Sequence, residues 1–315
     1  IDLESSLAMR LAVLFVIAVL CFALCQNLPQ HEITALHDLY ESTMGSAWTE
    51  TWPINDPTAL PCASYFGVLC DATNSTVVKI VLPGNNLGGT LPNSLGNFSN
   101  LESLVLSHNY LEGNLTDSLY TLRKLKILYL LNNQLGGQLS EQIGNLVSLT
   151  QIYLFSNRFT GTIPVSIKNC TQLEIVYFYT NQFSGPFPIS VLELPRLRIL
   201  GLANNKFTGH LPANIGYKLA SLTKLYLFKN NFTGGVPESL YSMTNLEIFD
   251  IRNNSALGGT LSPNITNLQS LSYLGMSRCN LGGELPEMHS LKKLVTVQLA
   301  FNRLSGIVPI LNSSS

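Results

Sequence analysis

The chain repeats one pattern of apolar and polar positions along most of its length. Leucines alternate with variable residues in the order L-x-x-L-x-L, and an asparagine followed by L/F-x-G closes each unit. Closing positions lie 24 residues apart, with departures of one residue in the second half. A period of roughly 20–29 residues with this spacing is typical of leucine-rich repeats. The ten closing positions are Asn85, Asn109, Asn133, Asn157, Asn181, Asn205, Asn230, Asn254, Cys279 and Asn302.

Each repeat divides into three parts. The L-x-x-L-x-L stretch has a period of two, which predicts a short strand with its leucines facing inward. The asparagine follows where the chain turns, and its amide can both donate and accept hydrogen bonds. We expect it to satisfy backbone groups of its own and adjacent repeats. An ending such as Leu91–Pro92 or Ile163–Pro164 then reverses the chain. One repeat buries too little apolar surface to order its own backbone, so the repeats fold only as a stack.

The region before the repeats contains a candidate signal peptide. Met9 is the expected start, because the chain begins with Ile1 and acidic residues follow it. Arg10 and the apolar run Leu11–Leu24 then predict a secretory signal cleaved before Gln26. The alternative is a membrane anchor, although the run is shorter than the roughly 20 residues that cross a bilayer.

These observations predict four segments. Terminal repeats normally need a polar closing unit. The last residues provide none, so we expect a fragment of a longer protein. The segments are residues 1–25 (upstream residues and signal peptide), 26–76 (N-terminal cap), 77–309 (about ten repeats) and 310–315 (uncapped end).

The predicted cap combines a helix, two tryptophans and two cysteines. Pro29–Met44 has the spacing of an amphipathic helix. The loop after it carries Trp48 and Trp52, which we expect to cover the open end of the stack. Cys62 and Cys70 should form a disulfide in an oxidising compartment. Zinc is a poor alternative, because no second Cys/His pair lies nearby at ligand spacing. We expect the later cysteines, Cys170 and Cys279, to be buried thiols.

Potential N-glycosylation sites are frequent. Their density, together with the signal peptide, favours the secretory pathway and a location outside the cell or on its surface. The eight sequons begin at Asn74, Asn97, Asn114, Asn169, Asn231, Asn253, Asn264 and Asn312.

The repeat endings, the leading helix and the cysteine pair around Tyr65–Val68 resemble plant-type leucine-rich repeat proteins over about residues 28–309. That family includes receptor-kinase ectodomains and polygalacturonase-inhibitor-like proteins. The resemblance implies an α/β solenoid, a right-handed superhelix with a concave parallel β-sheet and an N-terminal helical disulfide cap. Two features depart from it. The cap is one residue longer than C-x-W-x-G-V-x-C, and the run Leu39–Trp48 looks more like protist or algal relatives.

Charge and composition exclude several classes of function. The net charge is −1, and only 12% of residues are charged, without a basic cluster. Nucleic acid is therefore not an expected partner. The five histidines fall at different positions of the repeat, and neither a carboxylate pair, a Ser/His/Asp set nor a phosphate-binding loop converges. We expect no enzyme activity in these residues, no cofactor and no metal.

Two columns of variable positions on the concave face carry large apolar side chains. Large exposed apolar patches mark interaction surfaces, so we predict a binding strip with a small-residue notch at Gly201 and Ala203. Such a strip suits an extended peptide or a glycan. Alternatively, the rings only stabilise the sheet by stacking. Beyond the strip, Asp250 and Arg252 should form an exposed ion pair of little energetic value. The predicted ligand-binding residues are Tyr129, Leu131, Tyr153, Phe155, Tyr177, Tyr179, Lys224, Tyr226 and Phe228.

The sequence thus favours a non-catalytic extracellular module that binds a peptide, protein or glycan. The resemblance implies the ectodomain of a receptor-like protein, with a membrane contact only if a span follows the C-terminus. Two alternatives remain. One is a secreted inhibitor of a polysaccharide-degrading hydrolase, and the other is a structural wall or matrix protein.

Overall fold

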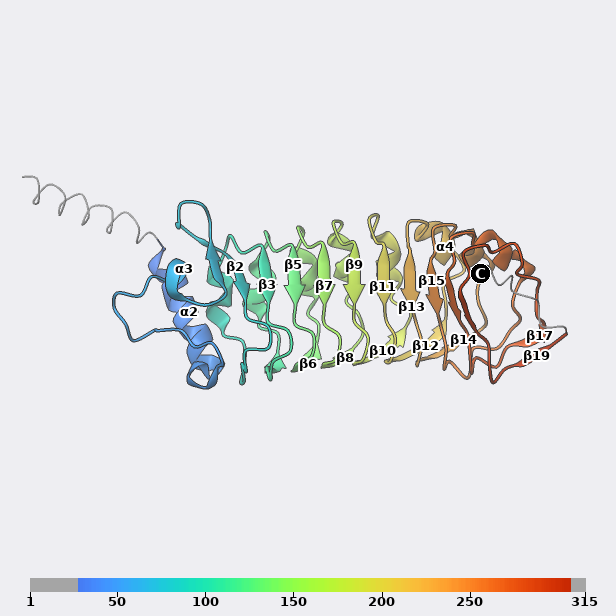
Figure 1. Ribbon diagram of the computed structural model, residues 1–315, viewed down its shortest axis with the longest axis horizontal. Helices are drawn as coiled ribbons and strands as arrows, with labels where there is room; N and C mark the ends of the chain where they lie inside the picture. The colour runs from blue at the N-terminus through green and yellow to red at the C-terminus, as the bar shows by residue number, and fades with distance from the viewer. Residues whose placement is uncertain (1–27, 307–315) are drawn as a thin grey trace, which may run out of the picture.

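The computed structural model describes residues 28–306, which form one elongated stack of repeats (Figure 1). Its main sheet has eleven strands, of which β1 comes from the cap and the other ten come one from each repeat. Neighbouring strands are parallel except for β1 and β2, which are antiparallel. The predicted α/β solenoid with a parallel sheet is confirmed. The strands are β1 (Val68–Cys70), β2 (Val77–Val81), β3 (Ser103–Val105), β5 (Ile127–Tyr129), β7 (Gln151–Tyr153), β9 (Ile175–Tyr177), β11 (Ile199–Gly201), β13 (Lys224–Tyr226), β15 (Ile248–Asp250), β16 (Tyr273–Gly275) and β18 (Thr296–Gln298).

A second parallel sheet of six strands runs along one edge of the stack, at the bottom of Figure 1. Sequence analysis assigned these residues to the reversing turn, so this sheet was not anticipated. It forms because equivalent residues of successive coils lie side by side and pair their backbones. Its strands are β4 (Glu112–Asn114), β6 (Gln134–Gln138), β8 (Arg158–Gly161), β10 (Gln182–Pro186), β12 (Lys206–His210) and β14 (Asn231–Thr233), and β17 (Gly282–Glu284) pairs separately with β19 (Arg303–Ser305).

Short helical turns return the chain to the start of the next strand. Most are 3-10 helices that follow the proline, threonine or serine of the repeat ending. They are η2 (Asn93–Asn97), η3 (Asp117–Thr121), η4 (Glu141–Asn145), η5 (Val165–Asn169), η6 (Ile189–Glu193), α4 (Ile215–Lys218), η7 (Glu238–Ser242) and η8 (Pro263–Asn267).

The core lies between these layers and continues from repeat to repeat. The inward leucines of the strands are fully buried. Phe159, Phe183, Phe207 and Phe232 form a second row, with centroids of neighbouring rings 6.0–6.5 Å apart and planes within 15° of parallel. Each repeat therefore shares its apolar surface with both neighbours, as a stack requires.

The closing asparagines tie neighbouring coils together as predicted. Nδ2 of Asn109 donates to the carbonyl oxygens of Leu82 (2.8 Å) and Leu106 (3.0 Å). Its Oδ1 accepts the N–H groups of Asn85 (2.9 Å) and Leu87 (3.0 Å). One side chain thus satisfies backbone groups of two coils.

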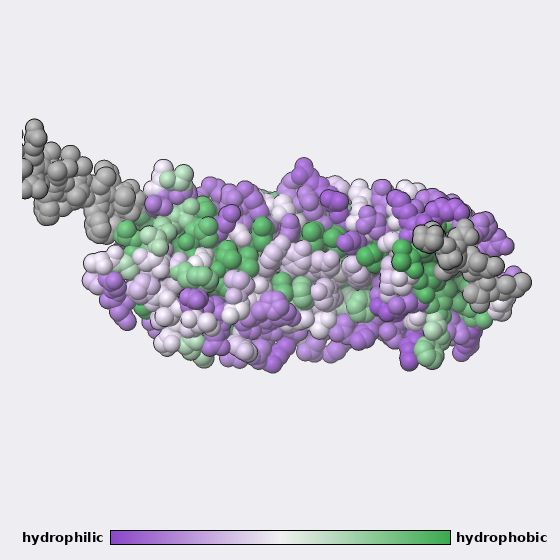
Figure 2. All heavy atoms as spheres, in the orientation of Figure 1, coloured by the Kyte–Doolittle hydropathy of each residue, from purple (hydrophilic) through white to green (hydrophobic). Residues whose placement is uncertain are grey.

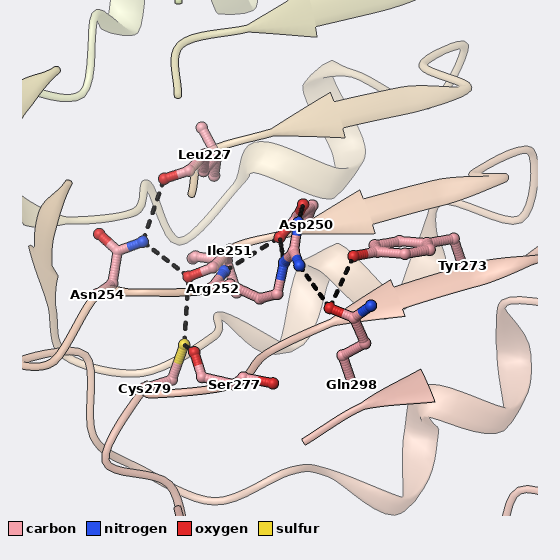
Figure 3. Close-up of polar contacts among 9 residues, drawn as sticks. All are labelled: Leu227, Asp250, Ile251, Arg252, Asn254, Tyr273, Ser277, Cys279 and Gln298. Atoms are coloured by element: carbon pink, nitrogen blue, oxygen red, sulfur yellow. Dashed lines mark hydrogen bonds and ion pairs between the residues drawn. The ribbon is translucent and has the colours of Figure 1, made fainter. Parts of the chain in front are cut away.

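Cys279 occupies the closing position of the ninth repeat and preserves half of this arrangement. Its thiol donates to the carbonyl oxygen of Ile251 at 3.2 Å (Figure 3). The N–H of Leu257 instead donates to the carbonyl oxygen of Asn254 at 2.9 Å. The longer turn of the preceding repeat therefore supplies the acceptor that a thiol provides poorly.

The cap covers the first repeat with α2 (Gln30–Ser42), η1 (Gly45–Ala47) and α3 (Pro61–Ser64). Trp48 and Trp52 are buried against each other, with ring centroids 4.8 Å apart. A disulfide joins Cys62 to Cys70, whose Cα atoms are 5.6 Å apart. The predicted helix and the tryptophan cover are confirmed.

A buried carboxylate fastens α2 to the sheet. Glu32 is 1% exposed, and it accepts hydrogen bonds from the hydroxyl of Thr76 (2.6 Å) and the N–H of Val77 (2.7 Å).

Several sequence expectations fall outside the described residues. These are the signal peptide, the end of the repeat region, the uncapped end and the sequon at Asn312. Within residues 28–306, Cys170 and Cys279 are free and buried. No helix in that range is long and apolar enough to cross a membrane.

Candidate functional site

The main sheet presents the predicted aromatic residues side by side, because parallel pairing aligns equivalent positions of successive repeats. Tyr129 pairs with Tyr153, and Tyr153 pairs with Tyr177. The first two rings meet edge to face at 4.3 Å between centroids, and the next two are tilted at 5.0 Å. All three side chains are half-buried. The predicted ladder of rings is therefore present.

The next outward position continues the apolar surface. Phe155 and Tyr179 stack at 4.3 Å with planes 14° apart. The rings of Tyr153 and Phe155 join the two columns at 6.4 Å. We call the combined surface the aromatic strip. It comprises Tyr129, Leu131, Tyr153, Phe155, Tyr177, Tyr179, Tyr226 and Phe228.

The small residues predicted to form a notch, Gly201 and Ala203, lie between strands that carry large rings, and the ring of Tyr177 narrows the space above them. Both residues are buried, and the ring of Tyr177 leans over Gly201 to within 6.3 Å of the ring of Tyr226. A Cβ on Gly201 would lie 2.6 Å from Cδ1 of Tyr177. A hollow of about 300 Å³ remains between Tyr177, Tyr179, Tyr226 and Phe228. The rings of Tyr177 and Tyr226 therefore connect the two parts of the strip beside this hollow.

The strip is wider than the two columns that sequence analysis identified. A third column lies at the second variable position of each L-x-x-L, and its half-buried isoleucines extend the apolar face. The signal was visible in the sequence as isoleucine recurring at one repeat position. These residues are Ile127, Ile175, Ile199 and Ile248. Figure 2 shows green and pale residues along the middle of this face, bordered by purple hydrophilic ones.

Burial changes the acidity of two phenol groups in the strip. Burial, with smaller contributions from neighbouring tyrosines, raises the pKa of Tyr129 and of Tyr177 to about 12. The hydroxyl of Tyr129 donates to Oε1 of Gln151. The phenols of Tyr129 and Tyr177 therefore stay uncharged to a higher pH than an exposed phenol does.

Asp250 and Arg252 end the strip as a structured ion pair, as Figure 3 shows. Nη2 and Nε of Arg252 lie 2.7 Å and 2.8 Å from the carboxylate oxygens of Asp250. The side chain of Asp250 is only 4% exposed, so the expectation of an exposed pair was wrong. Gly275 makes room for it, because a Cβ there would lie 2.7 Å from Oδ1 of Asp250.

The guanidinium of Arg252 also packs against two rings. Its Cζ lies 5.7 Å from the ring centre of Phe228 and 5.6 Å from that of Tyr273. Its Nη1 donates to Oε1 of Gln298, which also accepts the hydroxyl of Tyr273 at 3.2 Å. These contacts hold the C-terminal end of the strip in one arrangement.

The other charged groups near the strip are sparse. Lys224 and Lys229 belong to the same repeat as Tyr226 and Phe228, and neither forms an ion pair with any described residue. Near the N-terminal end of the strip, Lys126 pairs with Glu102 at 2.9 Å. No group of three or more His, Cys, Asp and Glu residues that could hold a metal ion occurs between residues 28 and 306.

Two further hollows lie away from the strip. One, of about 240 Å³, is in the cap between apolar residues such as Ile33 and Leu60. The other, of about 500 Å³, lies among turn residues including Arg278 and Arg303. Neither adjoins the aromatic residues that sequence analysis identified.

The sequons are accessible wherever the structure describes them. None of their asparagines lies on a strand of the main sheet, so the strip carries no glycan acceptor of its own. The exposed asparagines are Asn74, Asn97, Asn114, Asn169, Asn231, Asn253 and Asn264.

Comparison with known proteins agrees with the repeat geometry. A family model described as Leucine Rich Repeat matches residues 100–122, 124–146, 148–170, 196–217 and 221–243. No curated protein sequence matches the chain significantly.

Solved structures give a more specific comparison than the family model does. The LRR ectodomain of the Arabidopsis thaliana membrane receptor kinase GASSHO1/SCHENGEN3, in complex with CASPARIAN STRIP INTEGRITY FACTOR 2, is 35% identical with a TM-score of 0.70. The match covers 73% of this chain and 28% of that one. The plant peptide hormone receptor RGFR1 in complex with RGF2 is 30% identical with a TM-score of 0.69, and the shares are 73% and 37%. The chain thus spans about a third of the length of these relatives.

A plant ice-binding protein has a TM-score of 0.75 and 21% identity over 90% of each chain, a likeness that shows the fold alone. The repeats and the two receptor ectodomains together define the class. The chain is a leucine-rich repeat protein of the plant type.

Proposed function

We propose that the chain is an extracellular recognition module whose concave aromatic strip binds an extended peptide. The observation that carries this proposal is the continuity of the strip. Eight large, half-buried side chains from repeats three to five and seven form one surface without an ion pair or a metal-binding group among them. Aromatic residues give large contact areas at little cost in conformational entropy.

The comparisons support a peptide as the ligand. The receptor ectodomains of GASSHO1/SCHENGEN3 and RGFR1 were each solved in complex with a partner, and RGFR1 is a peptide hormone receptor. A receptor-like role, secretion and glycosylation of this chain are parts of the same proposal.

Ring stacking alone is the competing explanation of the strip. The contacts between Tyr129, Tyr153 and Tyr177 do stabilise neighbouring strands, by about 0.2–1 kcal/mol for each pair. That explanation does not account for the apolar second column, with Leu131 and Phe155, or for the hollow beside Tyr179. No observation specifically favours a hydrolase inhibitor or a matrix protein.

The test compares binding by the full chain, secreted from a eukaryotic host, with that of the variant Tyr153→Ala/Tyr177→Ala/Tyr226→Ala. The probes are arrayed synthetic peptides and arrayed cell-wall oligosaccharides. We expect peptides to bind the native chain, and we expect the variant to lose at least about 100-fold in affinity, because each buried ring contributes about 1 kcal/mol or more.

The matched control is Gln134→Ala/Gln182→Ala/Lys206→Ala on the second sheet, which should bind like the native chain. A strip variant that melts like the native chain and keeps its affinity contradicts the proposal. So does a native chain that binds oligosaccharides but no peptide.

A further inference from the structure

The hollow in the strip arises from two small residues between strands that carry large ones. Gly201 pairs with Tyr177 on one side and Tyr226 on the other. Two residues further along, Ala203 separates Tyr179 from Phe228. Strands lie about 4.8 Å apart, so these two rings face each other over roughly twice that distance. The space of about 300 Å³ between the four rings opens onto the concave face.

The walls of this hollow are fixed by contacts outside it. On the N-terminal side, Tyr179 stacks on Phe155 at 4.3 Å and meets Tyr177 edge to face at 5.5 Å. On the C-terminal side, the guanidinium of Arg252 lies against Phe228, and Asp250 holds that guanidinium (Figure 3). The hollow is therefore formed before any ligand arrives, which lowers the entropic cost of filling it.

Charges of both signs lie on this face, but the repeat that forms the C-terminal wall of the hollow carries two lysines. Lys224 and Lys229 flank Tyr226 and Phe228 in sequence and have no ion-pair partner among the described residues. Arg252 already occupies one face of Phe228. A cationic side chain between the rings would meet these like charges, whereas carboxylates beside the hollow would pair with the lysines.

The lining of the hollow carries few polar groups. The only polar side-chain atoms on its lining residues are the hydroxyls of Tyr177, Tyr179 and Tyr226. The carboxylate of Asp250, at the C-terminal end of the strip, already accepts three N–H groups of Arg252. Its oxygens are therefore committed, and an apolar occupant fits the lining best.

The geometry points to this hollow as the anchor pocket for one apolar side chain, such as leucine or proline, of an acidic extended peptide. The peptide crosses the strands, and its carboxylates meet Lys224 and Lys229. This inference rests on the proposed function and specifies its ligand.

The experiment uses synthetic peptides of about twelve residues in an aspartate/serine/glycine background, with leucine, proline, alanine or lysine at the centre. A second set replaces aspartate by lysine. Binding to the full secreted chain is measured by fluorescence anisotropy. We expect leucine or proline in the acidic background to bind at least about tenfold more tightly than alanine, lysine or any member of the basic set.

Three variants locate the anchor. Ala203→Leu fills the hollow with a residue that the same column already carries at Leu131, and it should weaken the leucine peptide at least about tenfold. Ala300→Leu, at the exposed equivalent position of the last repeat, is a control for the substitution itself and should change nothing, and Ala203→Leu must also melt like the native chain because Ala203 is buried. Lys224→Glu/Lys229→Glu should shift the preference to the basic set.

The outcomes separate this inference from the proposed function. Peptide binding that is lost in the triple tyrosine variant but unchanged by Ala203→Leu overturns the anchor pocket and leaves the recognition surface standing. A preference for the basic set, or for lysine at the centre, also overturns the anchor. Absence of peptide binding to the native chain overturns both.

Discussion

At the scale of single residues, the closing asparagine makes several hydrogen bonds to the backbone that a substitution would remove. Asn109 bonds the carbonyl oxygens of Leu82 and Leu106 and the N–H groups of Asn85 and Leu87. These groups are buried, and each one left without a partner costs about 1–3 kcal/mol. Leucine burial alone therefore does not hold the coils in register.

We expect Asn109→Ala to lower the free energy of unfolding by about 3–5 kcal/mol, because several buried backbone groups lose their partners. Asn109→Cys should fall between alanine and the native residue, since a thiol can still donate to a carbonyl as Cys279 does. Urea denaturation followed by circular dichroism measures both changes. A cysteine variant as unstable as the alanine variant would contradict this reading of Cys279.

At the scale of secondary-structure elements, two short helical turns carry buried tyrosines. Tyr120 in η3 and Tyr241 in η7 are each 1% exposed, and their phenol oxygens lie 3.5 Å from the N–H groups of Ser140 and Ser262. Burial raises the pKa of both phenols from 10.0 to about 12. The unfolded chain therefore loses these protons at a lower pH than the folded chain.

This difference predicts an alkaline loss of stability. The contribution of each phenol is complete below pH 10 and is lost as the pH rises toward 12. In Tyr120→Phe or Tyr241→Phe, the free energy of unfolding should fall by about 2 kcal/mol less over this pH range than in the native chain. Either variant should have a lower free energy of unfolding than the native chain at pH 9. Denaturation at about pH 9 and pH 12 measures how far the free energy of unfolding falls between these two pH values. Tyr217→Phe, at an exposed position, is the control, and an equal change there would refute the role of burial.

At the scale of the whole molecule, the sequons and the aromatic strip occupy different surfaces. The exposed acceptors Asn114 and Asn231 lie on β4 and β14, the two outer strands of the second sheet. Others lie on helical turns and loops, and none lies on the main sheet. Glycans at these positions would cover the sides of the stack and leave its concave face open.

We expect removal of N-glycans from the chain secreted by a eukaryotic host to lower its mass while leaving peptide binding within about twofold of its original value. Mass spectrometry and anisotropy measure the two effects. Asn253→Gln is a separate test, because Asn253 directly follows Arg252 at the end of the strip. If Asn253 carries no glycan and deglycosylation still causes a large loss of peptide binding, the sequons and the aromatic strip do not occupy separate surfaces.

The repeat, the inward leucines, the asparagine contacts and the columns in which Tyr129 and Phe155 lie can all be read from the amino-acid pattern alone. These features follow from the period of the pattern, because parallel pairing of identical units places each position beside its equivalent in the next repeat.

The tertiary structure alone decided how the side chains of neighbouring repeats share space. Tyr177 leans over Gly201 and narrows an expected gap, and Asp250 is buried because Gly275 leaves room for it. The second sheet likewise appears only when successive coils lie against each other. Ring orientations, burial and hollows depend on residues about 24 positions away that touch through space, and no local pattern specifies these contacts.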